Sequence, residues 1–371
     1  MANHAHICIV ADDDCLERFD SAVRHLCVGL IDEAVRTTVV GPRSAGIDSL
    51  EIGPVRVQTY GSLAWWRRKG SLADLVSRLG EDRPHLVHAL SGGTASLGAH
   101  VAAALDVPLV VTLTGTDELD EQTEPVLRSA AAIVAVSDPI RTQVIQRLER
   151  SAEDVVRVRW GLVPRQEPSC FLDEQKDPTL VVITPLAADA GLEHLLEAMG
   201  QLSRGAQPVM LFLLGSGPAE SDLRRRVNAL GLNERVTFAG LIREWPSVLQ
   251  GADVFIVPAP QHTLSIHAMT AMAAGLVVVA VEGGDQDCLI DGQTARIYSP
   301  PSAELLAAVL AEVLGDPGGA RRLAAAGQKY IGQNHRVSGM VDETLQLYRR
   351  LVLNQQTIPM RPAEPSESDE P

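Results

Sequence analysis

Short apolar runs alternate with amphipathic stretches along nearly the whole chain. In the first half these runs cover residues 6–10, 37–41, 55–59, 85–90, 108–114, 132–136 and 155–158. Most of them are separated by stretches with helical periodicity. Apolar runs of this kind predict parallel strands that are buried on both faces of a sheet, with helices as the crossover connections.

The second half repeats this alternation, with apolar runs at residues 179–183, 208–214, 235–238, 253–257, 276–281 and 295–298. The stretch between the halves, 161–178, contains three prolines and mixed charges and has no periodicity. The pattern therefore predicts an α/β protein with two doubly wound, Rossmann-like domains. Such domains bind ligands at the carboxyl ends of their strands, so we expect a cleft between them.

The composition shifts suggest where each part of the chain begins and ends. With 371 residues, the chain is too long for one ordinary hydrophobic core. The Pro-rich, acidic end of the chain is predicted to be disordered. We predict an amino-terminal domain, a linker, a carboxyl-terminal domain, a final helix that crosses back to the first domain, and a tail, at residues 1–165, 166–178, 179–337, 338–355 and 356–371.

Charge and cysteine usage narrow the class of protein. The formal net charge is −15, with 32 basic against 47 acidic residues. Nucleic-acid binding needs clustered Lys and Arg, so nucleic acid is not expected as a partner. Five cysteines without a C-x-x-C pair predict buried free thiols in a reducing compartment. The chain shows no signal-peptide pattern and no apolar run of membrane-spanning length, so we expect a cytoplasmic protein, with peripheral membrane contact left open.

Two loops that follow predicted strands carry glycines and hydroxyl groups. Gly92 and Gly93 lie in "HALSGGTASLG", and Thr114, Gly115 and Asp117 lie in "TLTGTDELD". Loops at the carboxyl ends of parallel strands face the cleft, where backbone N–H groups can bind an anion. The same residues equally suit a capped turn into a helix, and both interpretations stay open.

Three further motifs have a plain structural explanation beside a functional one. Gly215 and Gly217 in "LLGSGPAE" indicate a tight turn or, less strongly, a phosphate site, since no G-K-[ST] follows. Asp12–Asp14 indicate a helix cap or, alternatively, a Mg²⁺ site of a phosphatase. His85 and His88 lie on opposite faces of a strand, so no metal site is predicted from them.

The second half resembles one family from about residue 177 to residue 350. The resemblance is carried in order by segments such as "VMLFLLGSGPAESDLRRRVNALGLNERVTFAGLI", "WPSVLQGADVFIVPA" and "AMAAGLVVVAVEGG". These segments resemble the carboxyl domain of nucleotide-sugar glycosyltransferases of family 4, a large retaining group with the GT-B fold. In the first half, "PLVVTLTGTD" and "AAIVAVSDPIRTQVI" resemble the amino domain of that family more loosely.

The resemblance implies a nucleotide-sugar donor held mainly by the carboxyl domain and an acceptor held by the amino domain, with no metal or cofactor. The helix that begins near Ser265 is placed to stabilise a diphosphate leaving group. Asp117 is expected to assist at the acceptor side, and His262 takes the donor-sugar position. The other predicted donor-binding residues are Gly215, Thr263, Leu264, Thr270, Gly283, Gly284 and Asp287, and the acceptor-side residues are Gly92, Gly93, Thr114 and Gly115.

The chain departs from the family pattern at the donor site. Family members usually carry two glutamates eight positions apart, where this chain has His262 and Thr270. The glycine-rich loop after the first strand is absent, and no histidine lies near the "TGTD" segment. The G-G-x-x-E element persists with a conservative change, as Gly283, Gly284 and Asp287.

Two cations that grip the donor diphosphate in the family are also replaced, by Pro185 and Ala190. Each charge-assisted hydrogen bond to phosphate contributes about 1.5–3 kcal/mol. Their loss predicts donor binding weaker by roughly two orders of magnitude or more, unless another cation enters. Arg159 and Arg243 are candidates for that cation.

Three functions follow as hypotheses. The first is a metal-independent, retaining glycosyltransferase of the hexosyltransferase type, which transfers a sugar from a nucleotide-sugar donor to a glycan, lipid or small-molecule acceptor. The second is a catalytically impaired GT-B protein kept as a binding or regulatory module. The third, ranked well below these, is a Mg²⁺-dependent phosphatase that uses Asp12–Asp14.

Overall fold

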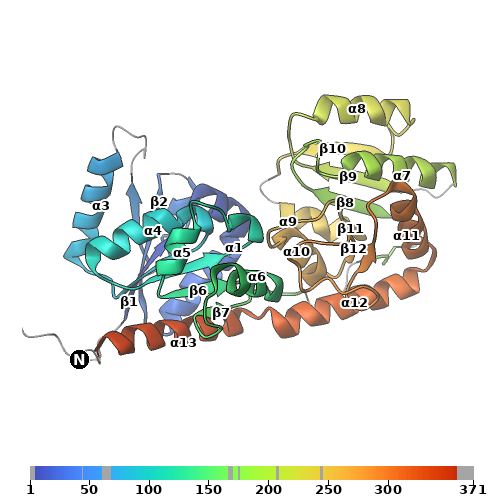
Figure 1. Cartoon of the computed structure of the whole chain (residues 1–371). Helices are drawn as coiled ribbons and strands as arrows, with labels where there is room; N and C mark the ends of the chain where they lie inside the picture. The colour runs from blue at the N-terminus through green and yellow to red at the C-terminus, as the bar shows by residue number, and fades with distance from the viewer. Residues whose placement is uncertain are drawn as a thin grey trace, which may run out of the picture.

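The computed structural model describes residues 5–43, 45–60, 68–165, 170–173, 176–205, 209–242 and 245–356. The predicted tail lies almost wholly outside these residues, and the predicted linker lies partly outside them. Within the described ranges the chain forms two α/β lobes that lie side by side, with the last two helices running along both (Figure 1).

The first lobe contains a seven-stranded sheet in the order β3-β2-β1-β4-β5-β6-β7. All neighbouring strands are parallel, and β1 pairs with β2 so that His6 lies opposite Arg36. Each of the seven apolar runs of the first half forms one strand, as predicted. The strands are β1 His6–Val10, β2 Arg36–Pro42, β3 Arg56–Tyr60, β4 Leu86–Ala89, β5 Leu109–Leu113, β6 Ala132–Ala135 and β7 Val155–Arg157.

The second lobe contains a six-stranded parallel sheet in the order β10-β9-β8-β11-β12-β13. The strands are β8 Thr179–Ile183, β9 Met210–Leu214, β10 Val236–Gly240, β11 Val254–Val257, β12 Val277–Val281 and β13 Arg296–Tyr298. The strand order reverses between β8 and β11, and in the first sheet between β1 and β4. Ligands of doubly wound proteins bind at the carboxyl ends of the strands beside such a reversal.

Several helices begin at a hydroxyl or carboxylate cap. Helices connect most of the strands. In the first lobe they are α1 Asp13–Asp32, α2 Ala45–Asp48, α3 Arg68–Glu81, α4 Gly92–Leu105, η1 Thr116–Glu118, α5 Glu124–Ser129 and α6 Asp138–Leu148. The rest are α7 Leu192–Arg204, α8 Glu220–Ala229, α9 Trp245–Val248, η2 Leu249–Gly251, α10 Ile266–Ala274, α11 Ala303–Gly315, α12 Pro317–Asn334 and α13 Val337–Gln356. None of the helices in the described ranges is long and apolar enough to cross a membrane.

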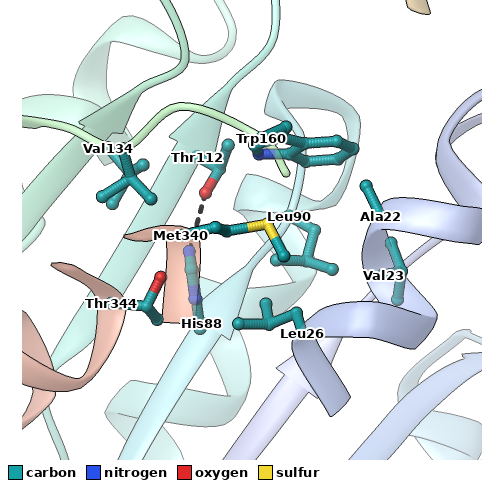
Figure 2. A pocket seen from close by; sticks show the side chains of 11 residues that line it. Ala22, Val23, Leu26, His88, Leu90, Thr112, Val134, Trp160, Met340 and Thr344 are labelled. Atoms are coloured by element: carbon teal, nitrogen blue, oxygen red, sulfur yellow. Dashed lines mark hydrogen bonds between the residues drawn. The ribbon is translucent and has the colours of Figure 1, made fainter. Parts of the chain in front are cut away.

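The last helix, α13, returns from the second lobe and packs on the first. A Cβ atom at Gly29 of α1 would lie 2.3 Å from Val341 Cγ2, so the two helices approach closely because this residue is glycine. The buried ring of His88 lies 2.6 Å from the Tyr348 hydroxyl of α13 and 2.7 Å from the Thr112 hydroxyl of β5. Figure 2 shows this ring at a small pocket that α13 helps to line with Met340 and Thr344. The helix is therefore part of the first hydrophobic core.

Buried histidines make the stability of this fold depend on pH. Burial lowers the pKa of His88 from 6.5 to about 3, and it lowers those of His267 and His335 to about 4. Below pH 6.5 these histidines are protonated in the unfolded chain but stay neutral in the folded chain. The free energy of unfolding that they contribute above that pH is therefore lost as the pH falls. Each histidine contributes a slope of about 1.4 kcal/mol per pH unit in this range.

We therefore expect the free energy of unfolding, measured by urea denaturation, to fall between about pH 7 and about pH 5.5, a window above the range of most carboxyl groups. His88→Gln keeps a side chain that can bond Thr112 and Tyr348 but does not titrate there. For this variant, the slope of the free energy of unfolding against pH is expected to be smaller by about 1.4 kcal/mol per pH unit, which is the contribution of one proton. Equal slopes for both proteins would contradict the assignment of a neutral His88.

The five cysteines are buried and free, as predicted from their spacing. Burial raises the pKa values of Cys8, Cys27 and Cys288 to about 12. These thiols therefore stay protonated and inert at neutral pH. All five cysteines act as small apolar side chains of the two hydrophobic cores.

Candidate active site at the domain junction

Loops from the carboxyl ends of the two sheets meet directly. The loop after β5 pairs with the segment before α10, far away in sequence. Thr114 accepts a hydrogen bond on its carbonyl from Leu264 N at 2.6 Å, and Thr116 N donates to the His262 carbonyl at 2.8 Å. We call these segments, residues 114–117 and 261–265, together with 284–286, the domain junction. The junction brings Asp117 and His262, which the sequence predicts as catalytic, to one place.

Gly115 lies at a close approach of the two domains, where it forms an antiparallel β-bridge with Thr263. Its φ of −160° is ordinary extended backbone, so conformation does not require glycine here. Space does: a Cβ atom would lie 2.3 Å from the His262 carbonyl oxygen and 2.7 Å from Thr263 Cα. The predicted acceptor-side glycine thus holds the two lobes together.

A third segment of the junction comes from the loop after β12. The buried Asp285 carboxylate accepts hydrogen bonds from Thr116 N at 2.9 Å and from the Thr116 hydroxyl at 2.8 Å. The preceding glycines, Gly283 and Gly284, have φ values of +105° and +92°, and a Cβ atom on Gly284 would lie 2.3 Å from the Gln261 carbonyl oxygen. The glycine pair therefore shapes the turn that aims Asp285 across the junction. Sequence inspection gave no signal for Asp285 itself.

Asp287, the acid of the G-G-x-x-E element, is bound across the domain boundary. One of its carboxylate oxygens accepts from Asp138 N at 3.3 Å and from Arg159 Nη2 at 3.3 Å. Arg159 also pairs with the Asp138 carboxylate at 3.3 Å. Asp138 also pairs with Arg157 at 2.6 Å, so the carboxylates of Asp138 and Asp287 balance two arginines. Arg159 is thus held in an ion-pair cluster, which weakens its case as a diphosphate cation. Arg243, the other candidate, lies outside the described residues.

The helix α10 begins with the predicted cap. The Ser265 hydroxyl accepts a hydrogen bond from Ala268 N at 3.3 Å, and Ser265 N donates to the Gln286 side chain at 3.0 Å. Gln286 in turn donates to the Thr263 carbonyl at 2.6 Å. The helix ends at Gly275 in the left-handed conformation, with φ of +80°. Its positive end thus points into the junction and is held there by the Gln286 side chain of the loop after β12.

The two positions where the family carries glutamates differ in what they offer. Thr270 donates its hydroxyl hydrogen to the Ile266 carbonyl at 2.7 Å, so its hydroxyl can act toward a ribose only as an acceptor. His262 has an exposed side chain, and the junction uses its carbonyl instead. The neighbouring His267 ring packs edge-on against Trp245, with centroids 4.7 Å apart. Burial, assisted by the charge of Arg18, lowers the pKa of His267 to about 4, so this ring is neutral.

Arg18 reaches the junction from α1, a contribution that sequence inspection missed. Its Nη2 donates to the Thr263 hydroxyl, and its Nη1 donates to Asp14 at 3.2 Å. In Figure 1, α1 and α10 occupy the facing sides of the two lobes. The available signal was positional: α1 starts at the carboxyl end of β1, so its first turns face the cleft.

Asp117 is exposed at the edge of the junction. Desolvation raises the pKa of its carboxyl above the usual range, and the nearby charge of Arg18 opposes part of that rise. Its backbone N–H donates to the His262 carbonyl at 3.4 Å. The side chain is thus positioned by backbone that belongs to both domains and stays a candidate for contact with the acceptor.

Glu118 occupies the place where we predicted that the glycine loop could bind an anion. Its carboxylate accepts from Gly92 N at 3.1 Å, from Thr114 N at 2.9 Å and from the Thr114 hydroxyl at 2.7 Å. A Cβ atom on Gly92 would lie 2.7 Å from Glu118 Cβ, and one on Gly93 would lie 2.8 Å from an Asp12 carboxylate oxygen. The anion held by this loop is therefore the chain's own Glu118, and both glycines permit close packing.

Removal of the Glu118 carboxylate is expected to destabilise the amino domain. Glu118→Ala leaves three hydrogen-bond donors without their acceptor, at a cost of about 1–3 kcal/mol in the free energy of unfolding. Glu118→Gln is the matched control, because its amide oxygen can accept from both N–H groups while the Thr114 hydroxyl turns to accept from the NH₂ group. Urea denaturation compares the three proteins, and equal stability of the alanine and glutamine variants would contradict this account.

The remaining motifs follow their structural interpretations. Asp12 caps α1 by accepting from Cys15 N at 2.8 Å, and Asp13 and Asp14 lie in its first turn, where carboxylates suit the helix dipole. Gly215 has φ of +146°, and a Cβ atom there would lie 2.0 Å from the Thr184 carbonyl oxygen, which fits the tight turn. Within the described ranges, no group of three or more metal-binding side chains is present.

Comparisons with known proteins agree with this architecture. The model of the family described as "Glycosyl transferases group 1" matches residues 177–316, and that of "Glycosyltransferase Family 4" matches residues 21–164. Together these matches cover most of both lobes. The chain belongs to the glycosyltransferases that these two family models describe. It is thus an enzyme of glycosyl transfer, and the predicted family is confirmed.

Curated relatives of this chain are distant in sequence but similar over long stretches. Alpha-D-kanosaminyltransferase of Streptomyces kanamyceticus is 24% identical over 334 residues, which cover 81% of this chain and 85% of the relative. Glycogen synthase of Mycobacterium tuberculosis is 24% identical over 294 residues, which cover 74% and 71% respectively.

Solved structures match the fold over nearly the whole chain. A glycosyltransferase from Rickettsia africae gives a TM-score of 0.80 at 14% identity, covering 95% of this chain and 100% of that one. Anabaena HepE, solved in complex with UDP and glucose, gives 0.77 at 20% identity, covering 94% and 100%. With the two parallel sheets, these matches confirm the predicted GT-B fold of this glycosyltransferase.

Proposed function

We propose that this glycosyltransferase takes its sugar from a nucleoside-diphosphate donor bound at the domain junction. One observation carries the proposal: the bridge between residues 114–117 and 261–265 brings the capped start of α10, Arg18 and Asp117 together at the carboxyl ends of both sheets. Anabaena HepE, a protein of similar fold, has been solved with UDP-glucose, which supports this class of donor.

The donor diphosphate is assigned to the start of α10. A helix N-terminus stabilises an anion by its dipole. At α10 the N–H groups of Leu264, Ser265 and Ala268 already have acceptors within the chain, so the dipole is what acts on the diphosphate. Thr270, one turn along the helix, has a hydroxyl that can accept from a ribose hydroxyl. At the end of β8, where the family pattern has cations, exposed Pro185 and partly buried Ala190 add no charge. Donor binding therefore relies on fewer cations than the family pattern implies.

The transfer breaks the bond between the anomeric carbon of the donor sugar and the diphosphate oxygen, and it forms a bond to an acceptor hydroxyl oxygen. We assign Asp117 to orient that hydroxyl, since its side chain projects from the amino-domain loop beside the junction. The family resemblance implies retention of the anomeric configuration and no requirement for a metal. Positive charge at the leaving group then comes from α10 and from basic side chains.

A binding panel tests the proposal. We expect at least one of UDP, GDP, ADP and dTDP, or a corresponding nucleotide sugar, to raise the melting temperature of the protein, and the shift to shrink as salt is added. Absence of a shift with every one of these compounds at millimolar concentration would contradict it. Glycan, lipid and small-molecule acceptors are then compared with the donor that binds.

A further inference from the structure

The donor site lacks the two carboxyl-domain cations of the family pattern, and an arginine of the amino domain lies beside it. A diphosphate requires cationic partners, yet Pro185 and Ala190 are uncharged and Arg159 is paired with Asp138 and Asp287. Arg18 is a described cation that contacts the segment leading into α10. It comes from the amino domain, so the sequence of the donor domain gives no hint of it.

The contacts of Arg18 place its charge inside the junction rather than in solvent. Its side chain is 29% exposed, whereas its helical partner Asp14 is 76% exposed. Water screens the exposed Asp14 carboxylate, so its interaction with Arg18 is weak and leaves most of the Arg18 charge available. That charge acts on both sides of the junction. It helps to lower the pKa of His267 in α10, and it opposes the rise in the pKa of Asp117.

The guanidinium is also held in position. Nη2 donates to the Thr263 hydroxyl, which itself donates to the Thr114 carbonyl at 3.3 Å. This chain of hydrogen bonds fixes Arg18 to the bridge between the domains. A guanidinium has five N–H donors in a planar fork that fits two phosphate oxygens, so donors remain for a ligand.

We propose that Arg18 binds the donor diphosphate in this enzyme, in place of the carboxyl-domain cations of the family pattern. The proposal rests on the proposed function and deepens it. Because Arg18 and α10 belong to different domains, a diphosphate bound between them links the two lobes. Donor binding is then coupled to the closed arrangement of the domain junction.

Isothermal titration with the nucleoside diphosphate that binds the wild-type protein tests this assignment. Arg18→Gln keeps a donor for Thr263 but removes the charge, and we expect its Kd to rise by about 10–100-fold. The corresponding nucleoside without phosphates should bind both proteins alike. Arg18→Lys restores charge without the planar fork and is expected to recover part of the affinity.

Arg24→Gln is the matched control. Arg24 lies on the same helix and pairs with Asp20 four residues earlier, as Arg18 does with Asp14, but it contacts Ser49 of its own domain. We expect its Kd to be unchanged. Equal diphosphate affinity of Arg18→Gln and wild type would overturn the Arg18 assignment alone, whereas a wild-type protein that binds no nucleotide would overturn the proposed function as well. Melting temperatures verify that each variant is folded.

Discussion

Gly115→Ala is expected to reduce kcat/KM for glycosyl transfer by roughly 100-fold, the cost typical of a displacement of about 1 Å in a catalytic site. The added methyl group would lie 2.3 Å from the His262 carbonyl oxygen and 2.7 Å from Thr263 Cα, which are backbone atoms of the other domain. The methyl group would also lie 2.2 Å from Asp117 Oδ1, so the Asp117 side chain must move and the bridge must open. Steady-state kinetics with saturating acceptor measures the effect.

The stability of this variant should change much less than its activity, because the clash involves Asp117 and the backbone of the domain junction and not the packing of either core. Gly339→Ala is the control, since a Cβ atom at Gly339 of α13 meets nothing within 4 Å and alanine favours a helix. We expect full activity for that control. Wild-type kinetics for Gly115→Ala would mean that the bridge is not needed for catalysis.

The double substitution Pro185→Arg and Ala190→Lys is expected to lower the Kd for the preferred nucleoside diphosphate by about 100-fold or more. Each restored charge-assisted hydrogen bond to phosphate contributes about 1.5–3 kcal/mol. Both residues follow β8, beside the reversal of strand order at which doubly wound proteins bind ligands. Isothermal titration measures the gain.

The pair His262→Glu and Thr270→Glu serves as the comparison, because added carboxylates do not attract a diphosphate. We expect no gain in diphosphate affinity from that pair alone. An unchanged Kd in the cationic variant would show that residues 185 and 190 do not face the diphosphate. Binding that appears only in the cationic variant would instead show that the wild-type protein no longer binds a nucleotide donor.

The fold was predictable because parallel strands are buried on both faces and so appear as continuous apolar runs, such as residues 179–183 and 276–281. The cap at Ser265 was predictable for a similar local reason, since serine is a preferred residue at a helix N-cap. Both features are decided by neighbours in sequence. Their prediction therefore needed no knowledge of how the two domains meet.

The site was less predictable because its key contacts join segments far apart in sequence. Arg18 meets Thr263 across 245 positions, and Asp285 meets Thr116 across 169. The Glu118 carboxylate takes the N–H group of Gly92, which sequence alone left available for a ligand. Gly115 is required by the approach of another backbone and not by its own conformation, so no local pattern distinguishes it from an ordinary turn glycine.

Proton NMR of a reaction with the nucleotide sugar that binds most tightly shows whether the protein transfers a sugar and with which anomeric outcome. We expect release of nucleoside diphosphate together with a glycoside, or with free sugar when water is the only acceptor. The anomeric configuration of the newly formed product should match that of the donor. The rate should fall sharply in Gly115→Ala. Failure of the folded wild-type protein to release nucleoside diphosphate from any donor in the panel would contradict the account.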